Sequence, residues 1–167
     1  MTRSYVAPFD PALDLSFERV IDVRRELVWQ AWTEPKHLVK WFTPAPWSTI
    51  RADVDLRPGG RFDVVMRSPE GQEFPNSGCY LEVDDNERLV WSNAVMPGFR
   101  PARPIGSTSV DFAFTGIIAL EALGTKTRYT ATVLHADAEA CKRHEAMGFR
   151  HGWGAALDQL VAHMQRG

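Results

Sequence analysis

Hydrophobic residues recur with different periods along the chain, and each period predicts a different kind of element. Residues 16–23 (SFERVIDV) are rich in β-branched and aromatic side chains, which predicts a first strand. Apolar residues then recur at helical spacing over residues 24–33, and they do so again over 35–42. Pro35 begins the second stretch and is a common first-turn residue. The pattern therefore predicts two short helices directly after the first strand.

From Trp47 onward the period is two, which predicts strands with one apolar face each. The expected strands are 48–56, 61–68, two on either side of the polar corner 84–87 within 79–95, 110–122 and 126–136. The RPGG sequence predicts a tight turn, and residues 69–78 are interpreted as a second turn region. Residues 97–108 hold three prolines and two glycines and predict a long loop. Loops of that length are more often functional than merely connecting.

The last 30 residues return to helical spacing, with one apolar stripe along the predicted helix. The stripe consists of Trp153, Leu157, Leu160, Val161 and Met164. Asp137 is a typical N-cap residue for this segment. Gly148, Gly152 and Gly154 fall within it, and each glycine costs about 1 kcal/mol relative to alanine inside a helix. The three glycines indicate either a kink or a close approach to the helix backbone.

This order of elements predicts an α+β fold. Strands joined by short turns pair as antiparallel neighbours, and one long amphipathic helix covers their apolar face. We therefore expect a curved antiparallel sheet wrapped around the C-terminal helix, with the two short helices after the first strand and space between sheet and helix. Residues 1–14 hold two prolines and no periodicity, so we interpret them as an N-terminal arm that lies on the domain or on a partner. Residues 15–167 are expected to form a single domain.

Six segments of the chain resemble the SRPBCC superfamily, in the order typical of that family. They are VWQAWTEPKHLVKWF (28–42), DLRPGGRF (55–62), GCYLEV (78–83), ERLVWS (87–92), TRYTATVLHA (127–136) and HEAMGFRHGWGAALDQL (144–160). The superfamily has the helix-grip fold of birch-pollen-type allergens, START lipid-transfer domains and polyketide cyclases. Within it, the chain is most similar to the bacterial branch related to the C-terminal domain of the activator of heat-shock-protein-90 ATPase. One departure is Trp41-Phe42-Thr43-Pro44, where the family often has two tryptophans and Gly-Pro, which leaves the path of the next loop open.

The resemblance implies a deep apolar cavity that binds hydrophobic or aromatic small molecules. Such cavities are lined mainly by apolar and aromatic side chains with a few polar groups. Ordinary packing explains any single aromatic residue of this chain, but the inward-facing aromatic residues together favour a cavity between the sheet and the C-terminal helix. The candidate ligand-binding residues are Trp41, Phe62, Met66, Trp91, Phe112, Phe114, Tyr129, His135, Trp153 and Leu157. We expect the Trp153 indole between helix and sheet, near Phe114, as part of the cavity wall.

Histidines supply the polar candidates. His135 ends the last expected strand facing inward. There it either caps the next helix or bonds within the core, or it orients a ligand carbonyl or carboxylate or acts as acid or base near neutral pH. His144 and His151 are seven residues apart, which places them on one side of the predicted helix. The spacing of His144-Glu145 and His151 differs from the zinc motif H-E-x-x-H, so we expect no metal and no cofactor.

Charged residues add two smaller expectations. Asp55 precedes the RPGG turn, where we expect it to pair with Arg57 or Arg61 or to accept hydrogen bonds from turn amides. Arg100 and Arg103 lie in the long loop, where they are either solvated or form a cationic rim that attracts an anionic ligand.

Composition excludes several classes of protein. The chain of 167 residues has 19 basic and 21 acidic side chains and a net charge of −2, so no basic field attracts nucleic acid. It contains no signal-peptide-like N-terminus and no apolar run long enough to span a membrane, so we expect no membrane partner. Cys79 and Cys141 are too few for a secreted disulfide framework, which favours a reduced cytoplasmic protein. No Ser-His-Asp order or nucleophile elbow is present.

Three functions from different classes remain open. The first is binding of a hydrophobic or aromatic small molecule in the cavity, without a reaction. The second is an enzyme of the cyclase or dehydratase kind, in which His135 and Tyr129 supply the acid and base groups. The third is co-chaperone-like activation of an ATPase, which is least favoured because the eukaryotic activators carry an additional N-terminal domain. The sequence identifies no ligand, and it leaves a homodimer open.

Overall fold

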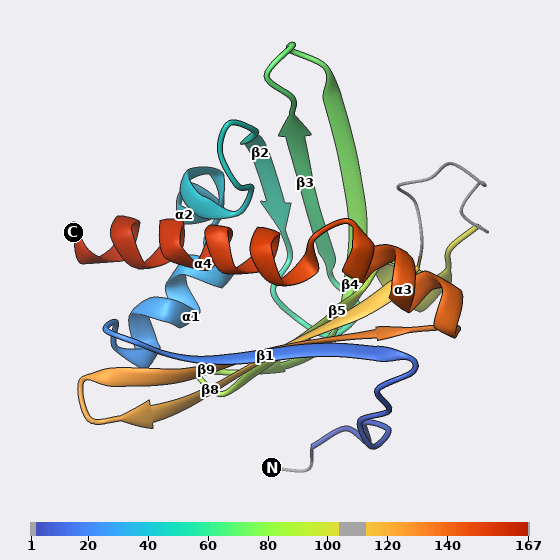
Figure 1. Ribbon diagram of the computed structural model, residues 1–167, viewed down its shortest axis with the longest axis horizontal. Coiled ribbons are helices and arrows are strands. Elements are labelled where there is room, and N and C mark those ends of the chain that lie inside the picture. Colours follow the sequence, from blue (N-terminus) through green and yellow to red (C-terminus); the bar gives the residue numbers. More distant parts are fainter. Residues whose placement is uncertain (1–2, 104–112, 167) are drawn as a thin grey trace.

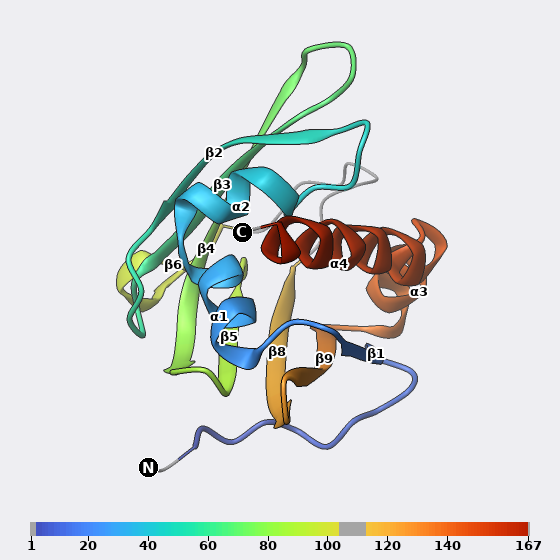
Figure 2. The same ribbon diagram turned by 90° about the vertical axis from the view of Figure 1, so that its left-hand side faces the viewer.

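The computed structural model describes residues 3–103 and 113–166, and one large antiparallel sheet dominates it (Figure 1). The sheet has seven strands in the order β1-β9-β8-β5-β4-β3-β2. They are β1 (Asp14–Ile21), β2 (Ser48–Val54), β3 (Arg61–Arg67), β4 (Glu73–Asp84), β5 (Arg88–Ser92), β8 (Phe114–Leu123) and β9 (Lys126–His135). The helices are α1 (Arg25–Thr33), α2 (Pro35–Trp41), α3 (Ala138–Ala146) and α4 (Phe149–Gln165). Figure 2 shows the sheet curving around α4, so the expected α+β helix-grip fold is confirmed.

Pro35 separates α1 from α2, as the sequence predicts. Glu34 is extended (φ −108°, ψ 123°), a conformation that residues before proline prefer. Pro35 then begins α2, where its missing N–H needs no partner. Leu38 and Trp41 bury one face of α2 in the core. Because α2 packs against both β2 and α4, this pair of helices bounds one side of the space between the sheet and α4.

The C-terminal segment forms two helices where the sequence predicts one. Gly148 separates α3 from α4 with a φ of 90°, a left-handed conformation that glycine adopts without steric cost. Of the two alternatives expected for the glycines, a break in the helix is therefore correct at Gly148. At Gly154 the second alternative is correct, because another side chain approaches the helix backbone closely: an added Cβ would lie 3.0 Å from Arg19 Nη2. Asp137 caps α3 as expected, because its carboxylate accepts a hydrogen bond from the N–H of Ala140 (2.8 Å).

β4 is longer than the sequence predicts, because residues 73–78 belong to the strand and not to a turn. The turn itself is short: the N–H of Ser68 donates to the carbonyl oxygen of Gln72 (2.8 Å). On sequence grounds Pro75 favours interpreting this segment as a loop, since the proline nitrogen has no hydrogen to donate within a strand ladder. In the structure Pro75 pairs with β3, whereas β5 pairs with β4 only from Cys79 onward. Pro75 therefore occupies an edge-like position, where strands tolerate proline.

The RPGG turn forms as predicted between β2 and β3. Asp55 Oδ2 accepts a hydrogen bond from Arg57 Nε (2.9 Å), which is one of the two expected pairings. Arg61 pairs instead with Asp53 (3.1 Å). A Cβ added to Gly60 would lie 2.0 Å from the carbonyl oxygen of Asp55, so the turn admits no side chain at that position.

The long loop expected at 97–108 contains regular structure in its described part. β6 (Val95–Met96) and β7 (Arg100–Pro101) pair on either side of a 3₁₀ turn, η1 (Pro97–Phe99). Arg100 and Arg103 are exposed. The rest of the loop and the first residues of the strand expected at 110–122 lie outside the described residues.

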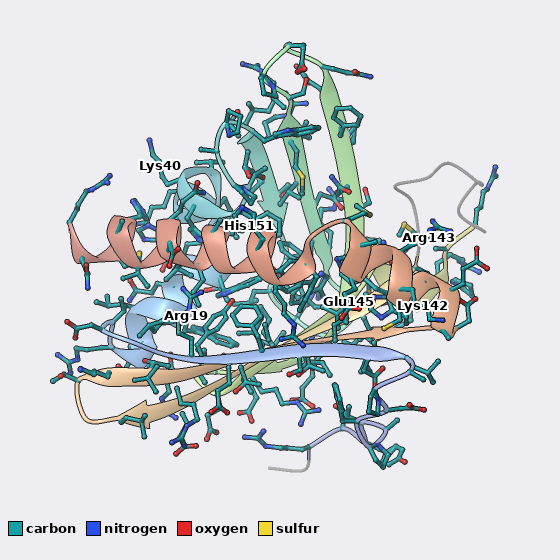
Figure 3. The ribbon with its side chains drawn as sticks, in the orientation of Figure 1. Arg19, Lys40, Lys142, Arg143, Glu145 and His151 are labelled. Atoms are coloured by element: carbon teal, nitrogen blue, oxygen red, sulfur yellow. The ribbon has the colours of Figure 1, made fainter. Side chains whose placement is uncertain are left out.

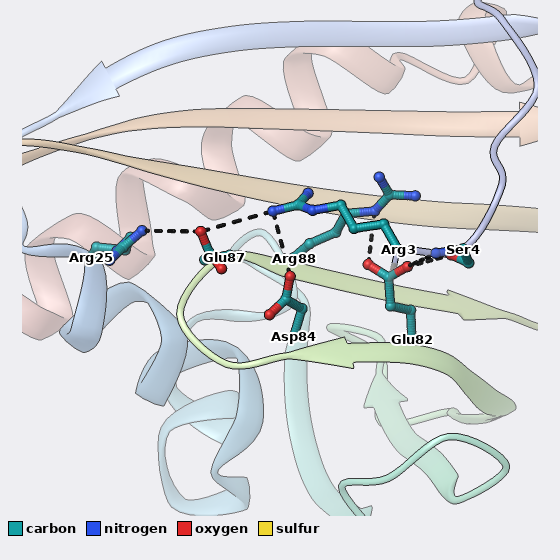
Figure 4. Close-up of polar contacts among 7 residues, drawn as sticks. All are labelled: Arg3, Ser4, Arg25, Glu82, Asp84, Glu87 and Arg88. Atoms are coloured by element: carbon teal, nitrogen blue, oxygen red, sulfur yellow. Dashed lines mark hydrogen bonds and ion pairs between the residues drawn. The ribbon is translucent and has the colours of Figure 1, made fainter. Parts of the chain in front are cut away.

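Charged and polar contacts hold the N-terminal arm against the outer face of the sheet, opposite α4 (Figure 4). Arg3 Nη2 lies 3.4 Å from Asp84 Oδ2, and the N–H of Ser4 donates to Glu82 Oε1 (3.0 Å). Glu82 also pairs with Arg88 (3.0 Å). Burial raises the pKa of the Glu82 carboxyl, but the Ser4 bonds and the two arginines offset this effect, and the pKa is lowered. The arm is therefore attached to the domain through ionised groups.

The core lies between the inner face of the sheet and α4. Leu157, Leu160 and Met164 of α4 are buried there, as the apolar stripe predicts. On the side facing β1, Arg19 Nη1 lies 2.6 Å from Asp158 Oδ1 and links the strand to α4 (Figure 3). Within the described part of the chain, no helix is both long and apolar enough to cross a membrane.

Candidate ligand-binding cavity

A cavity of about 390 Å³ lies between the inner face of the sheet, the α1–α2 pair and the α3–α4 connection. This volume falls within the range of about 300–1,000 Å³ typical of small-molecule sites. No Asp, Glu, Lys or Arg is found among the described residues that line it. A second hollow of about 430 Å³ lies on the outer face under the N-terminal arm, bounded by Val6, Phe9 and Arg88 among others. We place the candidate site in the inner cavity because aromatic side chains from both layers converge there.

Most of the residues expected from the sequence border this cavity. They are Trp41, Phe62, Met66, Trp91, Phe114, Tyr129 and Trp153. Leu157 does not border it: its side chain is 1% exposed and packs in the core, because the cavity adjoins only the first turns of α4. His135 does not border it either, for a reason given below. Phe112 lies outside the described residues.

The candidate residues expected from the sequence do not include several lining residues that come from helices or from a helix end. They are Trp32, Phe42, His144 and Phe149. The strands could be oriented by alternation, because every second residue faces inward. In a short helix the side chains point in all directions around the axis, so the sequence pattern does not decide which of them face the cavity. The angle at which α1 and α2 meet the sheet depends on packing that the sequence does not show.

Trp91 is the centre of the aromatic wall, and Gly116 makes room for its ring. The Trp91 ring centroid lies 5.2 Å from that of Trp32, 5.5 Å from that of Phe62 and 6.4 Å from that of Trp153. Trp91 of β5 pairs directly with Gly116 of β8. A Cβ added to Gly116 would lie 2.6 Å from Trp91 Cζ2. The glycine therefore lets the indole lie across the neighbouring strand, where it faces the cavity.

Trp153 lies between α4 and the sheet, in the place expected from the sequence. Its ring is nearly parallel to that of Trp91 (13°), and its centroid lies 5.1 Å from that of Phe149. It lines the same cavity as Phe114. The indole is only half-buried, so it borders open space and not a fully packed core.

Two histidines are hydrogen-bonded in series, and the second of them, His144, lines the cavity. The carbonyl oxygen of Leu13 can only accept, so His135 Nδ1 carries a hydrogen and donates to it (2.7 Å). In a neutral His135 the other nitrogen, Nε2, then accepts, and His144 Nδ1 donates to it (3.0 Å). This arrangement fixes both tautomers and leaves the lone pair of a neutral His144 on Nε2. His144, and not His135, is therefore the histidine of the cavity wall.

Burial, and secondly the neighbouring His135, lower the pKa of His144 to about 4. The His144 imidazole is consequently neutral near pH 7. A signal for its position exists in the sequence: Ala140, Cys141 and His144 share one buried face of α3. The expectation of a single continuous helix obscured that signal.

His144 and His151 do not share one side of a helix, because the break at Gly148 separates them. His151 is exposed on α4, and Lys142 and Glu145 are exposed on α3 (Figure 3). Across residues 3–103 and 113–166, no group of three or more His, Cys, Asp or Glu side chains is arranged to hold a metal ion.

Tyr129 contributes a hydroxyl group at the junction of β9 and α1. The Trp32 indole Nε1 donates a hydrogen bond to the Tyr129 hydroxyl oxygen (3.1 Å). Burial raises the pKa of the Tyr129 phenol, and the opposing effects of Trp32 and Arg19 are smaller. The phenol therefore stays protonated near pH 7.

Gln159 of α4 holds the loop that follows α2, where the chain departs from the family pattern. Its Nε2 donates to the carbonyl oxygens of Trp41 and Thr43 (2.9 Å each), and its Oε1 accepts from the N–H of Ala45 (2.8 Å). Thr43 and Pro44 of this loop line the cavity. The loop is thus fixed as part of the cavity wall by three hydrogen bonds to one side chain.

A family model described as Activator of Hsp90 ATPase homolog 1-like protein matches residues 22–165. The matched range contains all four helices and every strand described above except β1. Among the curated proteins compared with the chain, none matches it significantly.

Solved structures of bacterial proteins share the fold. A protein from Nitrosomonas europaea is 45% identical with a TM-score of 0.88, and the match covers 95% of this chain and 97% of that one. The AHSA1 protein from Silicibacter pomeroyi is 22% identical with a TM-score of 0.66, covering 91% and 97%. A protein from Rhodobacter sphaeroides is 19% identical with a TM-score of 0.78, covering 97% and 98%. The last two, at such low identity, show the fold alone.

Proposed function

Because the chain belongs to the Activator of Hsp90 ATPase homolog 1-like family, whose fold suits ligand binding, we propose that it binds a hydrophobic or aromatic small molecule in the inner cavity. The observation that carries this proposal is the cavity of about 390 Å³ with its aromatic walls. Trp91 and Trp153 present two nearly parallel rings to it. Burial of apolar ligand surface against such rings is the dominant favourable term in this kind of binding.

The cavity favours binding over proton-transfer chemistry. An enzyme of the cyclase or dehydratase kind needs an acid and a base whose pKa values lie near the working pH. Tyr129 and His144 are the described lining groups that can exchange protons. The pKa of Tyr129 is raised and that of His144 is lowered to about 4, so both values move away from neutrality. We therefore keep the enzyme as the alternative function.

The other expectations from the sequence stay hypotheses. Activation of a chaperone ATPase follows from the family name alone, and a pulldown with a bacterial 90-kDa heat-shock homologue tests it. Exposed Tyr5, Phe9 and Phe99 keep a homodimer open, which light scattering after size exclusion would detect. A cytoplasmic location without nucleic-acid or membrane partners remains a prediction from composition.

Filling the cavity tests the proposed function. Gly152 lines the cavity, and a Cβ added there meets nothing within 4 Å. We expect Gly152→Leu to fold, since leucine is a good helix former, and to occupy the space that the ligand needs. The matched control is His151→Leu, which adds the same side chain to the exposed face of α4.

The measurement is titration with a hydrophobic fluorescent dye, together with mass spectrometry of small molecules that copurify with each variant. Wild type and His151→Leu should bind the dye and carry a copurifying molecule, and Gly152→Leu should bind at least tenfold more weakly. Equal dye binding by Gly152→Leu and wild type would place the binding site elsewhere and overturn the proposal.

A further inference from the structure

The Tyr129 hydroxyl group is a buried donor for which the described part of the chain supplies no acceptor. An indole N–H can only donate, so the Tyr129 oxygen is the acceptor in its bond with Trp32. The hydrogen of the hydroxyl group has no acceptor among the residues that the structure describes. Tyr129 is 2% exposed, so its side chain is largely shielded from bulk solvent. Buried polar groups are normally paired, and an unpaired one calls for an explanation.

The residue that carries this donor lines the cavity. Tyr129 and Trp32, the two residues that share the hydrogen bond, both line the cavity. Two other buried polar groups of this core find acceptors within the protein: the Trp41 indole donates to the carbonyl oxygen of Ala31 (2.8 Å), and the Thr127 hydroxyl donates to that of Val23 (2.6 Å). The buried Tyr80 hydroxyl has no partner among the described residues either, but only Tyr129 belongs to a residue that lines the cavity.

The cavity is also unfavourable for a charged ligand. The described residues that line it include no Asp, Glu, Lys or Arg, and His144 is neutral near pH 7. An ionised ligand group held beside Tyr129 would be buried without a partner of opposite charge, which is strongly unfavourable. A neutral acceptor, by contrast, completes the hydrogen bonding of the hydroxyl at no such cost.

We propose that the cavity selects a neutral, flat aromatic molecule with a hydrogen-bond acceptor such as a ketone carbonyl, and that the Tyr129 hydroxyl donates to this acceptor while Trp91 and Trp153 contact the rings. This inference rests on the proposed function, since it names the ligand class of the same cavity. The cavity volume accommodates a molecule of two or three fused rings.

Two probes of the same shape test the donor. Fluorene and 9-fluorenone are both flat and tricyclic, and only fluorenone carries a carbonyl oxygen. Calorimetric titration gives the ratio of their affinities for wild type and for two variants, Tyr129→Phe and Tyr80→Phe. Tyr80 is the matched control, because its hydroxyl is also buried without a partner among the described residues but does not border the cavity.

The affinity ratio of fluorenone to fluorene should fall about three- to tenfold in Tyr129→Phe and stay unchanged in Tyr80→Phe. An unchanged ratio in Tyr129→Phe overturns the inference while both probes still bind, and leaves the proposed function standing. If neither probe binds wild type, the ligand class named here is wrong; the dye titration described above then decides separately whether the cavity binds ligands at all.

An infrared measurement on wild type keeps the test independent of variant folding. The carbonyl stretch of bound fluorenone should shift to lower wavenumber than in an apolar solvent, as a donated hydrogen bond requires. An unshifted band contradicts the inference. As a test of charge, fluorene-9-carboxylate should bind at least tenfold more weakly than fluorenone, and tighter binding would show that the site accepts an anion.

Discussion

Tyr80 and Tyr129 carry the same hydroxyl group on the inner face of the sheet, in different surroundings. Tyr129 accepts a hydrogen bond from Trp32, and both residues line the cavity. Tyr80 stacks on Phe62 with centroids 5.2 Å apart, and its hydroxyl is buried without a partner among the described residues. Burial raises the pKa of both phenols, so both stay neutral near pH 7. Identical groups therefore make different contributions to the free energy of unfolding.

Removing the Tyr80 hydroxyl should not destabilise the protein. A buried hydroxyl without a partner loses its bonds to water on folding and gains none, so we expect Tyr80→Phe to be neutral or to stabilise by about 1 kcal/mol. Tyr129→Phe should instead cost about 1–3 kcal/mol, because it leaves the Trp32 N–H unpaired. Urea denaturation measures both values. A loss above about 1 kcal/mol in Tyr80→Phe would indicate that this hydroxyl has a partner after all.

Among the elements, strands were easier to predict from the sequence than helices were. Alternation grouped Phe62 with Met66 on one face of a strand and directed Phe114 toward the C-terminal helix, and all three residues line the cavity. The same alternation directed His135 inward, where it is buried, but the end of β9 is covered by Leu13 and by α3. Alternation shows which way a side chain faces and not what covers it. The positions of helices relative to the sheet depend on long-range packing, which a local pattern does not contain.

Two glycines in different elements should respond oppositely to alanine. At Gly116 in β8 an added Cβ would lie 2.6 Å from the Trp91 ring, so Gly116→Ala should displace the indole and cost about 1–3 kcal/mol. At Gly152 in α4 a Cβ meets nothing within 4 Å, so Gly152→Ala should stabilise by about 0.5–1 kcal/mol through helix propensity. Thermal and urea unfolding give both values. Similar effects at the two sites would contradict this assignment of roles.

At the scale of the whole molecule, a charged outer face and an uncharged cavity are separated by one layer of sheet. Arg3, Glu82 and Arg88 interact on the outer face, where water can reach ionised groups. On the inner face His144 is kept neutral by burial. The two faces should therefore respond differently to acid, and the inner one contains His144, whose protonation is disfavoured mainly by burial.

Acid should destabilise the fold through His144. Its pKa is 6.5 ordinarily and about 4 in the folded protein, so between these values the unfolded chain binds a proton that the folded protein does not. The contribution is fully present above pH 6.5 and is lost as the pH falls toward 4, by about 3 kcal/mol at most. His144→Gln should flatten the pH dependence of stability in this window, whereas His151→Gln, at an exposed site, should not. Equal slopes in wild type and His144→Gln would refute the assignment.

The sheet joins the two ends of the chain, and this has a consequence for protein synthesis. Asp14 of β1 pairs with Leu134 of β9, which lies 120 positions later in the sequence. At translation rates of about 5–20 residues per second, the first strand exists for roughly 6–24 seconds before its partner has been made. Pairing between segments so distant is also intrinsically slow, since a long loop must close first. On the ribosome, the apolar face of β1 therefore stays without its native partners until β9 and then α4 emerge.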